Sequence, residues 1–148
     1  MRRFALLYGR WSLLLAVCSC AASAGREHMN LGGRGDELPY SHAVLAGDTL
    51  YVAGTLGVDP QTGTVPLDVE QEIRLCLDGI RAKLALAGMT MDDLVSIQVF
   101  CPDLTLYERF NAIYRTYFDD AFPARAFVGS GPLLRGARFE INGVAVRR

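Results

Sequence analysis

Residues Pro123 to Val146 read Pro-Ala-Arg-Ala-Phe-Val-Gly-Ser-Gly-Pro-Leu-Leu-Arg-Gly-Ala-Arg-Phe-Glu-Ile-Asn-Gly-Val-Ala-Val. This pattern is typical of two strands joined by a loop rich in glycine and proline. In the second strand Arg138, Glu140 and Asn142 alternate with apolar residues, so a period of two places all three on one face. Arg125 lies at the start of the first strand among apolar residues. We expect Arg125 and Glu140 on neighbouring strands, either as a site that binds an anion and moves a proton or as a structural ion pair.

The chain before this stretch alternates between strand and helix patterns. Apolar runs at 41–46 and 49–53 flank a Gly-Asp turn, and residues 94–100 form a further strand pattern. Two helices are expected, one from the N-cap Asp68 to Gly88 and one over residues 105–118. The apolar face of the first helix consists of Ile73, Leu77, Ile80 and Leu84. This order of elements predicts an α+β sandwich with both helices on one face of a mixed sheet.

The second face of the predicted sheet is also partly apolar. Val44, Tyr51, Val128 and Val144 fall on strand positions that cannot all point toward the helices. A sheet with apolar residues on both faces needs a second cover. We therefore expect the chain to associate with copies of itself through this open face.

Composition limits the classes of function. The length of 148 residues fits one domain, the net charge is −1, and the basic side chains form no run longer than the pairs Arg2-Arg3 and Arg147-Arg148. Nucleic-acid binding through a basic stripe therefore has no support. Cys76 and Cys101 lie outside any CxxC or Cys/His cluster, so no metal site is expected. Each is interpreted as a small buried apolar residue, with a single disulfide as the open alternative.

The N-terminal segment, residues 1–24, has the layout of a signal peptide. Basic residues precede the apolar run 11–20, and Ala22-Ser23-Ala24 forms a small-residue cleavage pattern. The run is too short for a stable membrane span. We expect a periplasmic or secreted protein cleaved near Ala24, with a lipid anchor on Cys20 as a lesser alternative. A competing interpretation starts translation at Met29 and leaves a cytoplasmic domain.

Residues 25–37 are rich in glycine and charge and lack periodicity, so they are interpreted as a flexible lead-in. The folded domain is expected to cover residues 38–148.

Several short patterns occur in order through this domain. They are Leu38-Pro39-Tyr40-Ser41, Leu50-Tyr51-Val52-Ala53-Gly54, Val58-Asp59-Pro60-x-x-Gly63, Phe122-Pro123-Ala124-Arg125, and Glu140 near the end. As a set they resemble the YjgF/RidA family of enamine/imine deaminases. The resemblance implies a chorismate-mutase-like α+β fold, a homotrimer whose sheets form a central barrel, and active sites in the clefts between subunits.

The resemblance also implies roles for single residues. Arg125 matches the arginine that holds the substrate carboxylate, and Glu140 matches the glutamate that positions the attacking water. Tyr40, Gly54 and Asn111 match residues of the family's substrate-binding site.

Three positions depart from the family pattern. Ala126 follows the motif arginine where the family usually has Ser or Thr, and Thr55 follows the glycine where Gln is frequent. Asn142 stands where many members have a second acid. These departures put the family's usual substrate in question.

The implied function is that of a 2-iminobutanoate/2-iminopropanoate deaminase-like hydrolase, which forms 2-keto acids and ammonia without a cofactor. A guanidinium binds a carboxylate in a fixed orientation, and a partly buried carboxyl group directs water and moves a proton. The alternative is a non-catalytic trimer that binds or scavenges small molecules with the same cleft. A ribonuclease or translation inhibitor and a chaperone-like protein are the remaining family functions, and the absence of a basic face weighs against the ribonuclease.

Overall fold

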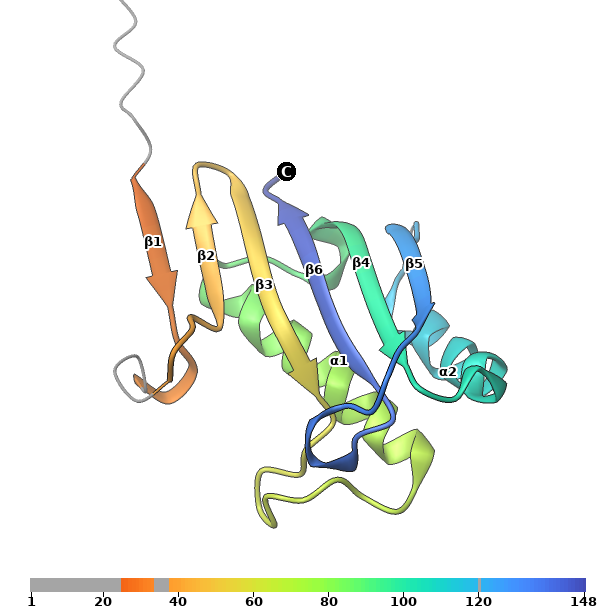
Figure 1. Cartoon of the computed structure of the whole chain (residues 1–148). Helices are drawn as coiled ribbons and strands as arrows, with labels where there is room; N and C mark the ends of the chain where they lie inside the picture. The colour runs from red at the N-terminus through yellow and green to blue at the C-terminus, as the bar shows by residue number, and fades with distance from the viewer. Residues whose placement is uncertain (1–24, 34–37, 120) are drawn as a thin grey trace, which may run out of the picture.

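The computed structural model describes residues 25–33, 38–119 and 121–148, which form one sheet and two α-helices (Figure 1). The strands are β1 (Arg26–Met29), β2 (Ala43–Ala46), β3 (Thr49–Leu56), β4 (Leu94–Cys101), β5 (Ala124–Gly129) and β6 (Glu140–Val146). The helices are α1 (Val69–Leu86) and α2 (Tyr107–Tyr114). Short 3-10 turns cover Leu31–Gly33, Met91–Asp93, Leu104–Leu106, Arg115–Tyr117 and Leu134–Gly136.

The strands lie in the order β1-β2-β3-β6-β4-β5. All neighbours are antiparallel except β4 and β5, which run parallel and are joined through α2. The prediction of a mixed sheet is confirmed. The expectation that Arg125 and Glu140 lie on neighbouring strands is wrong, because β4 separates β5 from β6. A parallel pair needs a crossover, here α2, and β6 then returns antiparallel between β3 and β4.

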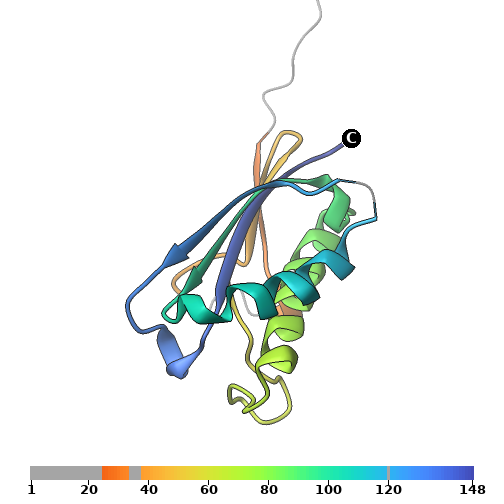
Figure 2. The same ribbon diagram turned by 90° about the vertical axis from the view of Figure 1, so that its right-hand side faces the viewer.

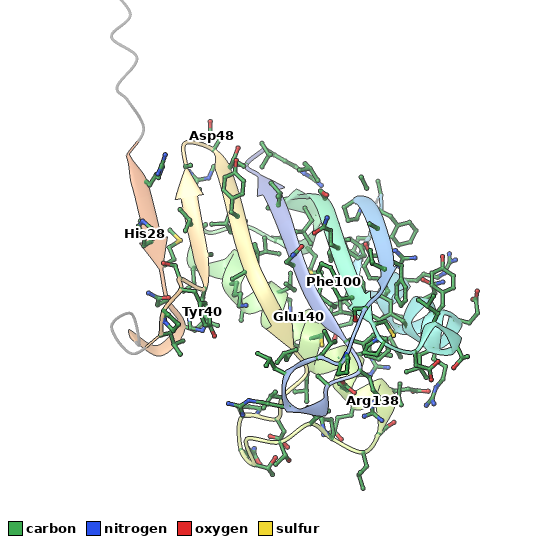
Figure 3. All side chains as sticks on the ribbon, in the orientation of Figure 1. His28, Tyr40, Asp48, Phe100, Arg138 and Glu140 are labelled. Atoms are coloured by element: carbon green, nitrogen blue, oxygen red, sulfur yellow. The ribbon has the colours of Figure 1, made fainter. Side chains whose placement is uncertain are left out.

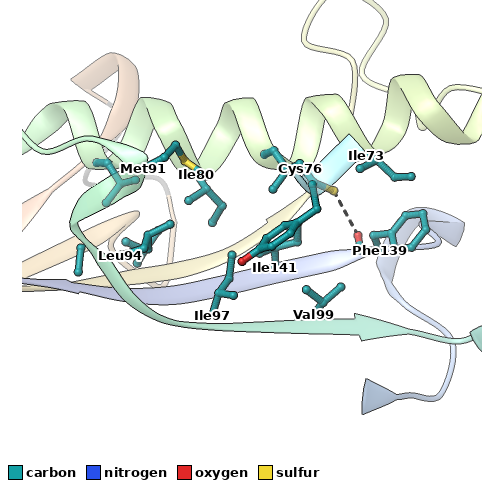
Figure 4. Close-up of a cluster of buried hydrophobic side chains, with 14 of the residues drawn as sticks. Ile73, Cys76, Ile80, Met91, Leu94, Ile97, Val99, Phe139 and Ile141 are labelled. Carbon is teal, nitrogen blue, oxygen red and sulfur yellow. Dashed lines mark hydrogen bonds between the residues drawn. The ribbon is translucent and has the colours of Figure 1, made fainter. Parts of the chain in front are cut away.

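Both helices lie on the same face of the sheet, as the sequence predicts (Figure 2). The four residues of the predicted apolar face of α1 are fully buried, and Figure 4 shows part of the core that they form. Asp68 caps the helix by accepting a hydrogen bond from the backbone N–H of Glu70, and α1 ends before Gly88, which has φ 68°. The second predicted helix is shorter than expected, because 3-10 turns form both of its ends.

Both cysteines of the domain are free and buried, which confirms their interpretation as core residues. The thiol of Cys76 donates to the carbonyl oxygen of Phe139 at 3.6 Å, across the layer between α1 and β6 (Figure 4). Burial raises the pKa of the Cys76 thiol, and burial also raises that of Cys101. A thiol with a raised pKa is a poor nucleophile, so neither group is suited to catalysis.

The open face of the sheet carries the apolar side chains that the sequence places there. Val44, Tyr51 and Val144 are direct cross-strand partners and so share one face. Tyr51 is 54% exposed, and Val128 on β5 is 39% exposed. In Figure 1 the strands pass in front of α1, so the open face of the sheet is the side toward the viewer.

The expected lead-in is partly ordered. Residues 26–29 form β1, which pairs antiparallel with β2, and His28 hydrogen bonds through Nδ1 to Ser41 Oγ at 2.9 Å. The sequence pattern missed this strand because its four residues lie at the sheet edge, mostly exposed, and so show no alternation. Three of them precede Met29, the alternative start. The predicted signal peptide, residues 1–24, lies outside the described residues. In the part of the chain that is described, no helix is long and apolar enough to cross a membrane.

A buried carboxylate on α1 fixes the start of β6. Glu72 is completely buried and accepts hydrogen bonds from the backbone N–H of Arg138 at 2.6 Å and of Phe139 at 3.2 Å. Its other oxygen pairs with Nε of Arg138 at 2.5 Å. Arg138 was expected to share the open face with Glu140, but it precedes the strand and turns toward α1 (Figure 3).

Glu72→Gln is expected to lower the free energy of unfolding by about 3 kcal/mol, because it leaves the Arg138 guanidinium without its counter-charge in a largely buried site. Chemical denaturation at neutral pH measures this loss. Glu70→Gln is the matched control on the same helix, since Glu70 is exposed and lies 4.0 Å from Arg109. It should change stability by less than about 1 kcal/mol. Equal effects of the two substitutions would contradict a special role for Glu72.

Candidate functional site

The side chain of Arg125 lies between β5 and α2. Its Nη2 donates to Oδ1 of Asn111 at 2.8 Å and to the hydroxyl of Tyr107 at 3.4 Å. Asn111 is a residue of α2 and is only 6% exposed, so burial restricts the position of its side-chain amide oxygen. Among the described residues no carboxylate pairs with Arg125, and its Nε and Nη1 donate to none of them. The guanidinium therefore keeps free donors for a ligand.

Aromatic rings surround this guanidinium. Its Cζ lies 4.7 Å from the ring centroid of Tyr114 and 5.6 Å from that of Tyr107. Rings at these distances attract a cation through their faces while excluding water. A pocket of about 170 Å³ opens here, lined by Arg125 and Asn111 together with Phe122 and Pro123. We call Arg125, Asn111, Tyr107 and Tyr114 the Arg125 half-site.

Glu140 lies in a second pocket, on the open face of the sheet, with Phe100 as its cross-strand partner (Figure 3). Its carboxylate rests against the backbone of Gly54, since a Cβ added there would lie 2.1 Å from Oε1 of Glu140. This pocket, of about 530 Å³, is also lined by Tyr40 and Arg135. We call Glu140, Gly54, Tyr40 and Arg135 the Glu140 half-site.

The two half-sites are separate within one chain. Arg125 pairs with Ile97 of β4, and Ile97 pairs with Gly143 of β6, three residues after Glu140. Two strand spacings of about 4.8 Å and three residues of about 3.3 Å put the Cα atoms of Arg125 and Glu140 about 14 Å apart. Their side chains also leave opposite faces of the sheet. A structural ion pair between them in one chain is therefore excluded, and so is a small ligand that touches both.

Two residues near Glu140 were not singled out from the sequence. Lys83 of α1 is buried, and its Nζ donates to the carbonyl oxygens of Ala53 and Gly54. The signal was available, because Lys83 falls on the apolar face of the predicted helix, three residues after Ile80. Arg135 has φ 60°, and its Nη1 donates to the carbonyl oxygen of Gly63 at 2.9 Å. No sequence pattern marks the conformation of Arg135.

Comparisons with known proteins show which family this chain resembles. Residues 35–147 match the protein family described as Endoribonuclease L-PSP. The 2-iminobutanoate/2-iminopropanoate deaminase of Bos taurus is 38% identical over 74% of this chain and 80% of its own length. The deaminase of the same name from Escherichia coli K12 is 36% identical over 74% and 88%. The crystal structure of the YjgF gene product from E. coli superposes with a TM-score of 0.71, at 36% identity over 74% of this chain and 89% of that one.

The chain belongs to the YjgF/RidA family. The resemblance inferred from the sequence is thus confirmed, and the mixed α+β sheet with two helices is the fold of the YjgF structure. Relatives at this level of identity bear the name of a deaminase, which agrees with the expectation of an enzyme.

The three departures from the YjgF/RidA pattern lie in different places. Ala126 and Asn142 fall in one cross-strand row on the open face, joined by Gln98. Thr55 is buried on the helix side, and its hydroxyl accepts a hydrogen bond from Nζ of Lys83 at 2.7 Å. Neither Ala126 nor Thr55 contacts the Arg125 guanidinium through a hydrogen bond. Over the described ranges no group of three His, Cys, Asp or Glu side chains could hold a metal ion.

The buried Lys83 predicts a particular dependence of stability on pH. Burial lowers its pKa from 10.5 to about 8, so between these two pH values the unfolded chain binds more protons than the folded one. The free energy of unfolding of wild type relative to Lys83→Met should therefore rise between pH 8 and 10.5, by up to about 3 kcal/mol. Urea denaturation of both proteins across this range measures the rise. Comparison with Lys83→Met removes the opposing contributions of Cys76 and the tyrosines, and parallel profiles would show that Lys83 titrates normally.

Proposed function

We propose that this protein hydrolyses 2-imino and enamine acids to 2-keto acids and ammonia. The observation that carries the proposal is the Arg125 guanidinium, which is fixed by a buried asparagine and four nearby rings yet has no carboxylate partner among the described residues. An arginine held in this way without a counter-charge is suited to bind the carboxylate of a ligand. The deaminase names of the relatives support the choice of substrate class.

The reaction needs two tasks beyond binding. A water molecule adds to the imine carbon, which gives a carbinolamine, and a proton then moves to the nitrogen that leaves as ammonia. A carboxylate in hydrogen-bond reach can accept the proton of the water and return it to the leaving nitrogen. Glu140 is the candidate for both steps, and Gly54 leaves the space that its carboxylate occupies. Tyr40 is 51% exposed and lines the same pocket as Glu140, so it is the candidate for a further contact with the ligand.

A homotrimer would bring the two half-sites together. We propose that the Arg125 half-site of one copy faces the Glu140 half-site of the next, with the open sheet faces packed into a central barrel. The separation of the half-sites within one chain supports this arrangement, and so do the exposed apolar side chains of Tyr51 and Val128. A closed threefold ring of this kind has three identical sites.

Substitutions of Arg125 and Glu140 test the catalytic roles. Arg125→Lys keeps the charge and loses the fork of donors, so kcat/KM should fall by about 10²-fold with little change in the thermal midpoint. Glu140→Gln removes the ionisable group and should lower kcat by about 10² to 10⁴-fold. The assay is ammonia release from 2-iminobutanoate or 2-aminoacrylate generated enzymatically in place.

Arg109→Lys and Glu108→Gln are matched controls on α2 that should keep wild-type activity. Saturable binding of the substrate without turnover by the parent protein would favour the scavenging trimer over the enzyme. Loss of stability in both Arg125→Ala and Glu140→Gln, with no activity in the parent, would refute the catalytic roles.

Mixed trimers test whether the site is shared between copies. Arg125→Ala and Glu140→Gln subunits are each inactive alone, but a mixed ring forms some interfaces that hold both native side chains. Every mixed ring of three has one interface with both native side chains, so the mixed rings should show about a third of wild-type activity. Co-expression of the two variants with different affinity tags, followed by purification on both, gives the sample to assay. Mixed rings as inactive as the parents would show that the two residues serve no common site.

A further inference from the structure

Lys83 is the only lysine in the sequence, and it is one of the most buried charged groups of the domain, at 4% exposure. Its Nζ donates three hydrogen bonds, to the carbonyl oxygens of Ala53 at 2.9 Å and Gly54 at 3.1 Å and to Oγ1 of Thr55 at 2.7 Å. It is absent from the ion pairs found among the described residues. A lysine this buried without an ion-pair partner is rare and calls for a specific reason.

An irregularity of β3 explains why Lys83 donates hydrogen bonds to this strand. The pairing of β3 with β6 shifts register between Val52 and Thr55, which is a β-bulge. At such a bulge the backbone leaves the regular ladder, so carbonyl groups there need donors from elsewhere. Lys83 supplies donors to the two residues inside the bulge, Ala53 and Gly54. The lysine therefore fixes the bulge from the core side.

The other side of the same bulge carries Glu140. Its carboxylate lies against Gly54 so closely that a Cβ on Gly54 would meet Oε1 at 2.1 Å. Lys83 and Glu140 thus lie on opposite sides of the backbone of one residue. A shift of Gly54 would move the surface on which the carboxylate rests.

We propose that Lys83 is a positioning residue for Glu140, in that its ammonium group holds the Ala53–Gly54 bulge in the shape that seats the carboxylate and places a positive charge behind it. The activity tests of this proposal rest on the proposed deaminase function. The coupling of Lys83 to Glu140 can be tested without any substrate.

The charge of Lys83 responds to its surroundings. Burial lowers its pKa to about 8, while the facing charges of Glu140 and Cys76 partly oppose this. Within the sheet and α1, these two groups are the ionisable neighbours that act on it. A neutral amine has two N–H donors for the three oxygens that the ammonium satisfies. Loss of the proton near pH 8 therefore weakens the support of the bulge.

The single lysine makes a direct test possible. Protein labelled with ¹³Cε-lysine gives one lysine side-chain signal in NMR, so its titration midpoint is assigned without ambiguity. We expect a midpoint near pH 8 in wild type. In Glu140→Gln the midpoint should be lower, because the carboxylate that favours the ammonium form is gone. A wild-type midpoint in the ordinary range near 10.4, or the same midpoint in both proteins, would overturn the coupling whether or not the protein is a deaminase.

Activity gives a second readout that separates positioning from folding. Lys83→Met keeps the length of the side chain without its donors, and Lys83→Gln keeps N–H donors without the charge. Lys83→Met should lower kcat by about 10 to 10²-fold with KM nearly unchanged, because the Arg125 half-site is intact. Lys83→Gln should recover part of that loss.

The wild-type kcat should also decline as the pH rises through about 8, and this step should be missing in Lys83→Met. Arg81→Met, at an exposed position of the same helix paired with Asp78, is the matched control and should behave as wild type. Wild-type kcat and an unchanged pH profile in Lys83→Met would show that Lys83 does not position the site. The titration of the native protein remains decisive if the variant fails to fold.

Discussion

Helix α1 carries two buried charges, and the geometry around Glu140 depends on both. Glu72 near the start of the helix holds the first residues of β6 through two backbone N–H groups and the guanidinium of Arg138. Lys83, about three turns further on, holds the bulge of β3. Glu140 is the first residue of β6 and rests on that bulge. One helix therefore fixes, from the core side, both strands that position the carboxylate on the open face.

The insertion of β6 between β3 and β4 separates Arg125 from Glu140. It places Glu140 beside β3 and leaves Arg125 on the edge strand β5, where α2 supplies its partners. A single chain thus keeps the Arg125 half-site and the Glu140 half-site apart. The open face with its apolar side chains gives such a chain a physical reason to assemble, and the proposed homotrimer would bring the two half-sites together. In the proposed homotrimer each copy supplies two surfaces, and the complete site lies between neighbouring copies.

Local patterns in the sequence predicted most of the elements. Asp68, Gly88 and the apolar spacing of α1 defined that helix, because caps and periodicity act over a few residues. The edge strand β1 was missed, since exposed residues at a sheet edge carry no alternation. Local patterns also could not predict the order of the strands in the sheet. It led to the wrong placement of Arg125 next to Glu140, because pairing between distant strands is decided by how the whole sheet packs.

The candidate site was predictable in part. Arg125, Glu140, Tyr40, Gly54 and Asn111 came from short motifs, and the structure divides them between two pockets. Lys83 was visible as a charge on an apolar helical face, yet its role became clear only when the bulge showed what it binds.

A crystal structure of the protein with a small 2-keto or 2-imino acid analogue tests the central claim most directly. We expect a trimer in which the carboxylate of the analogue contacts Arg125 of one copy while Glu140 of the adjacent copy faces its second carbon. An analogue bound to Arg125 with no second chain near it, or bound within one chain between other residues, would rule out a site shared between copies.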